Sequence, residues 1–283
     1  MLVDAHLHLQ DQRLDAIRPG LADVLKEKGI AHLVVNGTSM SDWAKVAACA
    51  HRFPEVIPSF GIHPWQIETH PKAWLEHLLD CLDTHGGSIG EIGLDRWRCK
   101  NNIDTQESVF LEQWNLANAR KLPVTVHCLK AWGRLMALIE KNPHQGPGFL
   151  LHSYSGPKEM VEDWVALGAR FSISGSFAHP RKEKKREVFN IIPRDRLLIE
   201  TDAPDMALPE SAQSCATTRD VDGKTINHPG NLDRVYAFAA QWLDISPLTL
   251  EKVVFANFIK MFRPVLHQSR EKPGSNTCQT HQG

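Results

Sequence analysis

The sequence predicts an α/β protein of the closed (β/α)8 class, the TIM barrel. Short apolar runs alternate with amphipathic helical segments along residues 1–264, and this alternation is typical of parallel strands joined by right-handed crossovers. Eight such units in 283 residues favour a closed barrel over an open doubly wound sheet. No glycine-rich phosphate-binding motif follows the first run, which also disfavours a dinucleotide-binding fold. We expect residues 1–264 to form a single barrel domain.

Each expected strand is a short apolar run that stops at a glycine, a proline or a polar residue. The runs lie at 2–8, 31–35, 56–60, 88–91, 123–126, 148–151, 169–173 and 196–200. Residues 31–35, for example, read Ala-His-Leu-Val-Val and end before Asn36-Gly37, and residues 56–60 end before Gly61. Short continuous runs of this kind are typical of strands that are buried on both faces, as in a parallel sheet.

The segments between the runs carry apolar residues at helical spacing. In the segment 14–28, for example, Ile17 and Leu21 lie about one helical turn apart. The same period predicts helices at 14–28, 41–53, 72–84, 106–121, 131–140, 158–167, 186–191, 232–243 and 247–262. We expect Ser41 and Ser246 to be N-caps, because a serine hydroxyl can accept a hydrogen bond from the first free backbone amides of a helix.

Two segments fall outside this alternation. Residues 203–230 form a long loop after the last expected strand, and loops of that length are often functional. Residues 265–283 are rich in Pro, Gly, Ser and Gln, and we expect them to form a mobile C-terminal tail.

The composition is that of a soluble globular protein, with 42% hydrophobic and 23% charged residues. The formal net charge of −1 argues against a nucleic-acid coat protein and against a membrane-surface binder. No apolar run reaches transmembrane length and the N-terminus enters a strand directly, so we expect no membrane association and a cytoplasmic location. The six cysteines lack CxxC spacing, which predicts reduced, structural thiols.

The first strand delivers two histidines, His6 and His8, with one residue between them. Side chains two apart in a strand point the same way, so both imidazoles can face one metal ion. A His-x-His pair is a modest signal by itself, and the remaining ligands must come from elsewhere in the chain.

The carboxyl ends of barrel strands converge on one mouth, where further ligands are expected. Side chains able to bind metal lie where six of the strands end: His6, His8, His63, Glu91, Asp95, His127, His152, Glu200 and Asp202. Any one of them is more often a polar strand end hydrogen-bonded to a loop. Their coincidence at one mouth indicates a metal centre.

Four histidines and two carboxylates exceed the needs of one tetrahedral ion, which predicts two divalent ions with a carboxylate between them. Glu91 is the expected bridge, because strand four lies across the barrel from strand eight and beside strand five. One ion is expected at His6, His8 and Asp202, and the other at His127 and His152. Such ligands accept Zn²⁺, Mn²⁺, Mg²⁺, Co²⁺ or Fe²⁺.

Together the strand-end motifs resemble the TatD family of metal-dependent hydrolases, within the amidohydrolase-like superfamily. The matching segments are DAHLH at 4–8, GIHP at 61–64, GEIGLD at 90–95, PVTVH at 123–127, LHSYSG at 151–156 and ETDAP at 200–204. They occur in the order that the family shows. The resemblance covers the chain from residue 1 to about residue 262.

This resemblance implies a (β/α)8 barrel with a divalent-metal centre and 3′–5′ exodeoxyribonuclease or related phosphodiesterase activity on DNA or another phosphoester. It implies metal-ligand roles for His6, His8, Glu91, His127, His152 and Asp202. In such a centre two ions activate a hydroxide, and the expected catalytic carboxylates are Glu91 and Asp202, with Asp202 as the base that orients or deprotonates the water.

Three segments depart from the family pattern. The usual Asn-Glu-Pro-x-Asn element reads Asn-His-Pro-Gly-Asn at 227–231. The arginine that usually follows the strand-five histidine is replaced within Cys128-Leu129-Lys130, and the aromatic residues after Gly-Leu-Asp are altered to Arg96-Trp97. All six ligand positions are kept, so these departures bear on substrate preference rather than on catalysis.

Several residues near the mouth are candidates for substrate contacts. His63, followed by the rigid Pro64, can hydrogen-bond a phosphate oxygen or leaving group, or it can fix its own loop. Lys130 can contact a phosphate. Trp65 and Trp97 each follow a mouth motif and can stack on a base.

Two other features have two interpretations each. Asp95 can orient a ligand histidine, which we favour slightly, or it can cap the next turn. The basic run at 181–186 can contact nucleic-acid phosphates, but such a run is more often a solvated face.

Two other function classes stay open. The first is a C–N or carboxylic or aminoacyl ester hydrolase of the amidohydrolase type. Many binuclear members of that class bridge their metals with a carbamylated lysine after strand four, so Glu91 at this place favours the phosphoesterase. The second is a non-catalytic metal-binding scaffold, which the retention of all six ligand positions disfavours.

Overall fold

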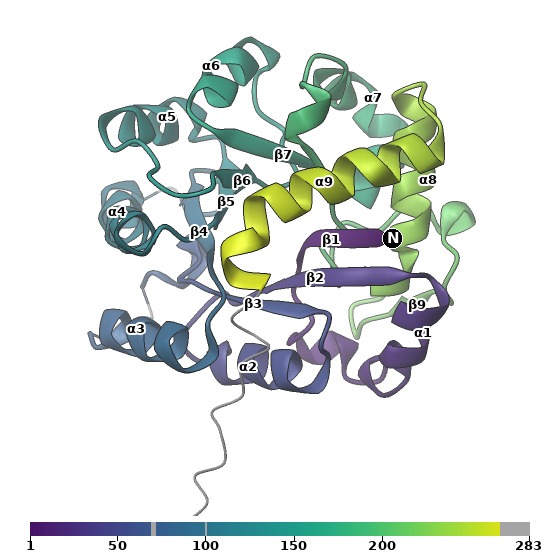
Figure 1. Ribbon diagram of the computed structural model, residues 1–283, viewed down its shortest axis with the longest axis horizontal. Coiled ribbons are helices and arrows are strands. Elements are labelled where there is room, and N and C mark those ends of the chain that lie inside the picture. The colour runs from purple at the N-terminus through teal and green to yellow at the C-terminus, as the bar shows by residue number, and fades with distance from the viewer. Residues whose placement is uncertain (69–71, 100, 267–283) are drawn as a thin grey trace, which may run out of the picture.

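Eight parallel strands form the barrel, and each strand neighbours the next one along the chain (Figure 1). The computed structural model describes residues 1–68, 72–99 and 101–266. The strands are β1 (Leu2–Leu7), β2 (Ile30–Asn36), β3 (Val56–Phe60), β4 (Ser88–Asp95), β5 (Val124–Leu129), β6 (Phe149–Leu151), β7 (Ala169–Ile173) and β8 (Leu197–Ile199). The predicted (β/α)8 class is confirmed.

The barrel closes where the chain leaves β8 and meets β1. The backbone amide of Asp202 donates to the His6 carbonyl at 2.9 Å. The buried carboxylate of Asp4 accepts from the backbone amide of Thr201 at 3.0 Å and from its hydroxyl at 2.5 Å. These bonds satisfy the polar groups that an open sheet edge would leave unpaired.

Helices surround the barrel in Figure 1. They are α1 (Leu21–Glu27), α2 (Trp43–Arg52), α3 (Trp74–His85), α4 (Ile103–Arg120), α5 (Trp132–Lys141), α6 (Val161–Ala166), α7 (Glu183–Arg186), α8 (Leu232–Trp242) and α9 (Pro247–Leu266). Trp43, Trp114 and Trp164 are fully buried beneath them. Truncation of a core tryptophan of this kind to alanine costs about 3–5 kcal/mol, so these side chains hold the helices on the barrel.

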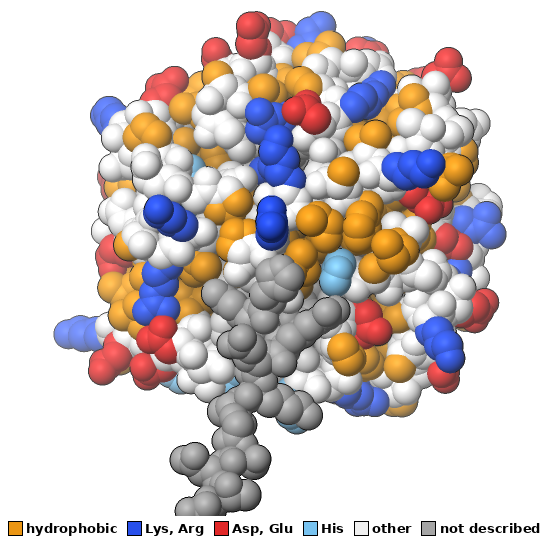
Figure 2. All heavy atoms as spheres, in the orientation of Figure 1, with side chains coloured by type: hydrophobic (Ala, Val, Ile, Leu, Met, Phe, Trp, Pro, Cys, Tyr) orange, Lys and Arg blue, Asp and Glu red, His pale blue; other side chains and the backbone are white. Residues whose placement is uncertain are grey.

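Helix α9 covers the amino-terminal end of the barrel. Its Asn257 amide donates to the Leu197 carbonyl at the start of β8, at 2.9 Å. Its Phe258 ring stacks on His32 near the start of β2, with ring centroids 5.7 Å apart. Figure 2 shows this face, where hydrophobic side chains gather beside α9 among scattered charged ones. Only the opposite, carboxyl-terminal end is left to hold a site of strand-end residues.

The structure corrects several predicted boundaries. β4 runs to Asp95 and β5 to Leu129, so Glu91 lies inside its strand rather than at its end, and His127 lies inside its strand rather than after it. The predicted strands end too early because the apolar run stops where polar residues that face into the barrel begin. The segment 14–28 is α-helical only over α1, because Pro19 lacks an amide donor and Gly20 is a poor helix former.

The expected N-caps have different outcomes. Ser246 accepts a hydrogen bond from the Thr249 amide at 3.1 Å, as expected of a cap. The expectation for Ser41 is wrong: its hydroxyl pairs with that of Ser39, and α2 begins one residue later, after Asp42. The Asp42 carboxylate instead accepts from the Thr38 amide at 2.9 Å and fixes the preceding turn.

Other segments also differ from the expectation in detail. The first turn of 158–167 and the segment 187–190 are 3-10 helices. The long loop at 203–230 contains a small antiparallel hairpin of β9 (Thr218–Arg219) and β10 (Thr225–Ile226). Helix α9 continues through residues 265 and 266, and the rest of the predicted tail, 267–283, lies outside the described residues.

The described cysteines, Cys49, Cys81, Cys99, Cys128 and Cys215, are free thiols, and Cys278 lies outside the described residues. Among the helices of the described chain, none has the combined length and apolar character needed to cross a membrane.

Gly93 lets β4 approach β5 closely enough to place Glu91 beside His127. Its φ angle is 149°, and a Cβ atom there would lie 1.9 Å from the His127 carbonyl oxygen. A side chain at this position must therefore push the two strands apart.

We expect Gly93→Ala to destabilise the protein by about 3 kcal/mol or more, because backbone rather than a flexible side chain blocks the new methyl group. Gly133→Ala is the matched control: Gly133 lies in α5 with open space around it, so alanine should stabilise by about 0.5–1 kcal/mol. Thermal or denaturant unfolding measures both changes. Equal stability of the two variants would contradict the strand contact.

Candidate metal centre

Glu91 lies at the centre of the barrel mouth and is only 2% exposed. Its backbone amide donates to the Gly37 carbonyl at 2.9 Å, which fixes the start of the side chain. Imidazoles from β1 and β5 and from the segments that follow β1, β3 and β6 face its two carboxylate oxygens. The two oxygens face different histidines and so define two groups of potential ligand atoms.

The first donor group consists of His6 Nε2, His8 Nε2, Glu91 Oε2 and Asp202 Oδ1. The histidine nitrogens lie 3.2 Å apart and 3.5 and 3.3 Å from Glu91 Oε2. They lie 3.4 and 3.6 Å from Asp202 Oδ1. Two ligand atoms of a tetrahedral zinc-sized ion are about 3.3 Å apart, so this spacing fits one ion.

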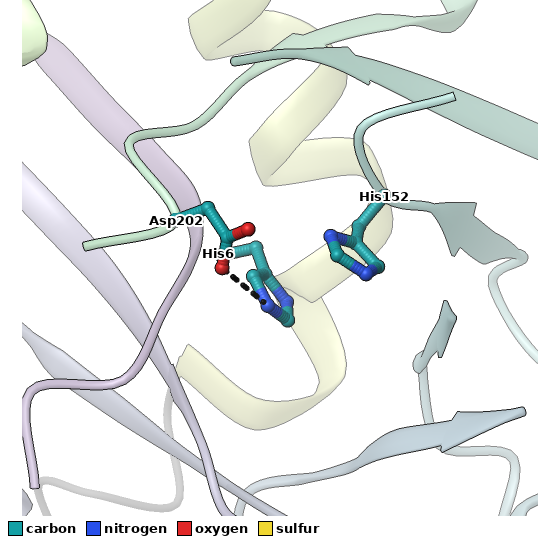
Figure 3. Close-up of side chains that lie close together, drawn as sticks. All are labelled: His6, His152 and Asp202. Carbon is teal, nitrogen blue, oxygen red and sulfur yellow. Dashed lines mark ion pairs between the residues drawn. The ribbon is translucent and has the colours of Figure 1, made fainter. Parts of the chain in front are cut away.

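The second donor group consists of Glu91 Oε1, His127 Nδ1 and His152 Nε2. The two nitrogens lie 3.1 and 2.8 Å from the oxygen and 3.3 Å from each other. The groups adjoin, because the His6 and His152 rings stack with centroids 4.1 Å apart. Figure 3 shows the His6 ring between the Asp202 carboxylate and the His152 ring.

The outer nitrogens of three histidines face hydrogen-bond acceptors. His8 Nδ1 lies 2.8 Å from the Asn36 carbonyl, and His127 Nε2 lies 3.3 Å from Asp95 Oδ2. His152 Nδ1 lies 3.6 Å from Glu200 Oε1, an ion-pair distance. Acceptors at these places hold the proton on the outer nitrogen and leave the inner lone pair for a cation, which is the usual arrangement around a bound metal.

His63 has the opposite arrangement. Its Nδ1 accepts the Trp65 backbone amide at 3.1 Å, so in the neutral ring Nε2 carries the proton. Nε2 lies 3.3 Å from Glu91 Oε1 and is close enough to form a metal-sized group with Glu91 and His127. A protonated nitrogen has no lone pair to offer, so His63 is suited to donate a hydrogen bond rather than to ligate.

Burial and charge shift the pKa values of the centre in opposite directions. Burial alone would raise the pKa of Glu91, but His63, His152 and His6 hold it well below its usual range. Burial alone would lower the pKa of His8, but the hydrogen bond to Glu91 and its charge raise it to about 9. The Glu91 carboxylate therefore demands positive charge beside it, as protons or as metal.

Two other histidines respond in the same way. Against the effect of burial, Asp95 and Glu91 raise the pKa of His127, and the charge of Glu91 together with Glu200 raises that of His152. Burial lowers the pKa of His63 to about 4, in keeping with a neutral donor.

The buried Asp202 differs from Glu91. Burial raises its pKa to about 6, although the neighbouring His152 and His8 lower it. A carboxyl group with this pKa near neutral pH can accept a proton and also return it. His6 stays neutral, because burial and the neighbouring His152 hold its pKa well below the usual range.

Sequence reasoning gave no role to three groups that support the centre. Glu200 was among the strand-end candidates, and here it accepts from the Ser172 hydroxyl at 2.5 Å and faces His152. The Asn36 carbonyl orients His8, and Asp4 accepts the His6 backbone amide at 3.2 Å. Asp4 was detectable, since an acidic residue inside an apolar strand needs partners.

Both interpretations of Asp95 agree with the structure. Its Oδ2 accepts from His127 Nε2, and its Oδ1 accepts the backbone amides of Trp97 and Arg98 at 2.7 and 2.8 Å. Burial opposes ionisation, but the hydrogen bonds from His127, Arg98 and Trp65 together outweigh it and lower the pKa of Asp95.

The predicted substrate residues lie at different places around the mouth. Trp65 and Trp97 are 40% and 58% exposed, and Lys130 is exposed after β5. The basic run 181–186 has mixed environments. The Arg186 guanidinium lies 4.4 Å from the centre of the Trp242 ring and Lys182 Nζ lies 5.5 Å from that of Phe177, whereas Arg181, Lys184 and Lys185 are exposed. Part of that run thus packs on the helices.

The fold and the two donor groups define the class: a metal-dependent hydrolase built on a (β/α)8 barrel. A model of the family "TatD related DNase" matches residues 3–263, and the chain belongs to this family.

Known proteins similar to this chain agree with that assignment. It is 30% identical over 265 residues to the 3′-5′ ssDNA/RNA exonuclease TatD of Cronobacter turicensis, covering 92% of this chain and 97% of the relative. It is 29% identical over 209 residues to the uncharacterized metal-dependent hydrolase YjjV of Escherichia coli, covering 73% and 80%.

Solved structures show the same fold. The crystal structure of YjjV, a TatD homolog from Escherichia coli, superposes with a TM-score of 0.82 at 25% identity and covers 93% of this chain and 98% of that one. A TatD-family hydrolase from Entamoeba histolytica gives 0.81 at 20% identity, covering 93% and 98%.

Asp95→Asn should weaken divalent-metal binding about 10- to 100-fold, because a neutral amide holds the His127 proton less firmly than a carboxylate does. Asp83→Asn is the control, since Asp83 is an exposed carboxylate that pairs with Arg120. Competition with a metal-binding dye measures the affinity of both variants. Unchanged affinity of Asp95→Asn would contradict the orienting role.

Metal uptake should release protons. The pKa values of His8, His127 and His152 are raised beside Glu91, that of His8 to about 9, whereas the pKa of Glu91 lies well below its usual range. Apparent metal affinity should therefore rise between pH 6 and pH 8, by about tenfold per pH unit for each proton displaced. Calorimetry in two buffers of different ionisation enthalpy counts the protons, and a count of zero would refute the expectation.

Proposed function

We propose that this protein hydrolyses phosphodiester bonds of single-stranded nucleic acid from the 3′ end, at a centre of two divalent ions. The observation that carries the proposal is the division of Glu91, with one oxygen in each donor group. The names of the TatD relatives support the substrate class and polarity.

The proposed ligands of the first ion are His6, His8, Asp202 and one oxygen of Glu91; those of the second are the other oxygen of Glu91, His127 and His152. Imidazole and carboxylate together suit Zn²⁺, Mn²⁺, Co²⁺ and Fe²⁺, and Mg²⁺ less well because it prefers oxygen. When bound at such a centre, divalent ions lower the pKa of water and neutralise charge on phosphoryl oxygens.

The chain's own residues supply the other requirements. The Asp202 carboxylate, which faces His6 and His8 in the first donor group, is the proposed acceptor of the proton of the attacking water. His63 donates its Nε2 proton in a hydrogen bond to a phosphoryl oxygen, and its own loop keeps that proton in place. Glu91 stays ionised throughout, because the imidazoles around it stabilise its charge.

Lys130 is assigned a weaker role, as a phosphate contact at the rim. It is exposed at the end of β5, where a cation contributes mainly long-range attraction for a polyanion.

The central experiment compares substrates across a panel of metals. Purified protein is given 3′-labelled and 5′-labelled single-stranded DNA and RNA, a p-nitrophenyl phosphodiester, and carboxylic and aminoacyl esters. Stepwise shortening from the 3′ end with Zn²⁺, Mn²⁺, Mg²⁺, Co²⁺ or Fe²⁺ supports the proposal. Ester cleavage without nucleic-acid cleavage would favour the amidohydrolase-type alternative, and no cleavage of any substrate would favour a scaffold.

Glu91→Ala and Asp202→Ala should each lower nuclease activity by more than about 10²-fold, because each removes a ligand together with a catalytic carboxylate. Removal of metal by a chelator should abolish activity in the unaltered protein, and added metal should restore it. Circular dichroism checks that the variants fold, and Asp83→Ala is the control. Full activity of either active-site variant would sink the assignment.

A further inference from the structure

An arginine lies on an aromatic ring at the edge of the second donor group. Arg98 follows Asp95 by three residues, where the chain leaves β4, and it is exposed. Its guanidinium carbon lies 4.1 Å from the centre of the Trp65 ring. This is a close cation–π contact, and it favours one position of a normally mobile side chain.

Trp65 is itself fixed to the metal centre. Its indole Nε1 donates to Asp95 Oδ2 at 2.6 Å, and its backbone amide donates to His63 Nδ1. The ring contacts His63 and His127 edge-on, with centroids 4.7 and 5.8 Å apart. The indole ring is therefore fixed in place, with His63 and the proposed metal ligand His127 near its edge and Arg98 over its face.

Among the described residues, no carboxylate forms an ion pair with Arg98, so its charge is not neutralised there. Asp95 is close in sequence, but its oxygens already accept from His127, Trp65 and two backbone amides. Arg13, on the loop after β1, offers a contrast: it pairs with Asp11 and Asp205, each at 2.8 Å.

We propose that Arg98 binds a phosphate of the substrate strand next to the scissile phosphodiester, and that Trp65 positions it. A guanidinium stacked by its face keeps its N–H edge free to form paired hydrogen bonds with a phosphate. This inference rests on the proposed function and names a substrate-binding residue of that same site.

The test is binding of a fluorescent single-stranded oligonucleotide, measured by anisotropy in the presence of a chelator so that no cleavage occurs. Arg98→Gln should weaken binding about tenfold and reduce the dependence of log affinity on log salt by about 0.7, the value for one phosphate contact. Arg96→Gln is the matched control, because Arg96 is an exposed arginine of the same loop for which no aromatic contact is seen among the described residues.

Variants of Trp65 test whether the positioning of Arg98 by the ring, and not only its charge, contributes to binding. Trp65→Ala removes the ring that positions the guanidinium, and it should weaken oligonucleotide binding about as much as Arg98→Gln does. The double variant should lose little further affinity. Trp65→Phe keeps a ring under the guanidinium and should restore most of the affinity. A role limited to folding would not give this pattern, and thermal unfolding of each variant checks for it.

The outcomes distinguish the two proposals. If the unaltered protein binds and shortens the oligonucleotide while Arg98→Gln and Arg96→Gln bind equally well, the assignment of Arg98 is overturned and the proposed function stands. If the unaltered protein neither binds nor cleaves single-stranded nucleic acid, both fall.

Discussion

The buried carboxylate of Glu91 is the constraint on which the rest of the site depends. Its two oxygens face imidazole nitrogens from several elements at 2.8–3.5 Å, and water reaches almost none of it. An isolated charge in such a place is costly, so the group is tolerable only with positive charge around it. Without metal, the raised pKa values of His8, His127 and His152 supply that charge as protons. A buried anion encircled by displaceable protons is also a receptor for divalent cations.

A second layer of acceptors faces three of the imidazoles. The Asn36 carbonyl, Asp95 and Glu200 face the outer nitrogens of His8, His127 and His152 in turn. Each acceptor belongs to, or directly follows, a barrel strand, so the arrangement of the strands places the acceptors that favour these tautomers. Nδ1 of His63 faces an amide donor instead of an acceptor. Its Nε2 therefore carries the proton, which suits His63 to donate a hydrogen bond rather than to bind a metal.

The order of strands and helices could be predicted because burial on both faces leaves short apolar runs. Residues at the strand ends could be grouped because a barrel has one mouth. The ends of β4 and β5 could not be predicted, because the apolar pattern is lost where Glu91 and His127 turn inward. The supporting roles of Glu200 and Asn36 depend on contacts between strands, and one is made by a backbone carbonyl. No pattern of side chains can reveal such a group.

The unpaired positive charges around the mouth are distributed unequally, and this favours the approach of a polyanion from one side. On the side of β1 and β8, Asp205 pairs with both Arg13 and Lys224, so these cations are already neutralised. On the side of β3 and β4, Arg98 rests on Trp65 with no carboxylate partner among the described residues. A polyanion gains most where positive charge is unpaired and already oriented, because little desolvation or ordering opposes the contact. We therefore expect the proposed substrate strand to approach over Trp65, and to reach His63, the proposed hydrogen-bond donor, before Asp202, the proposed proton acceptor.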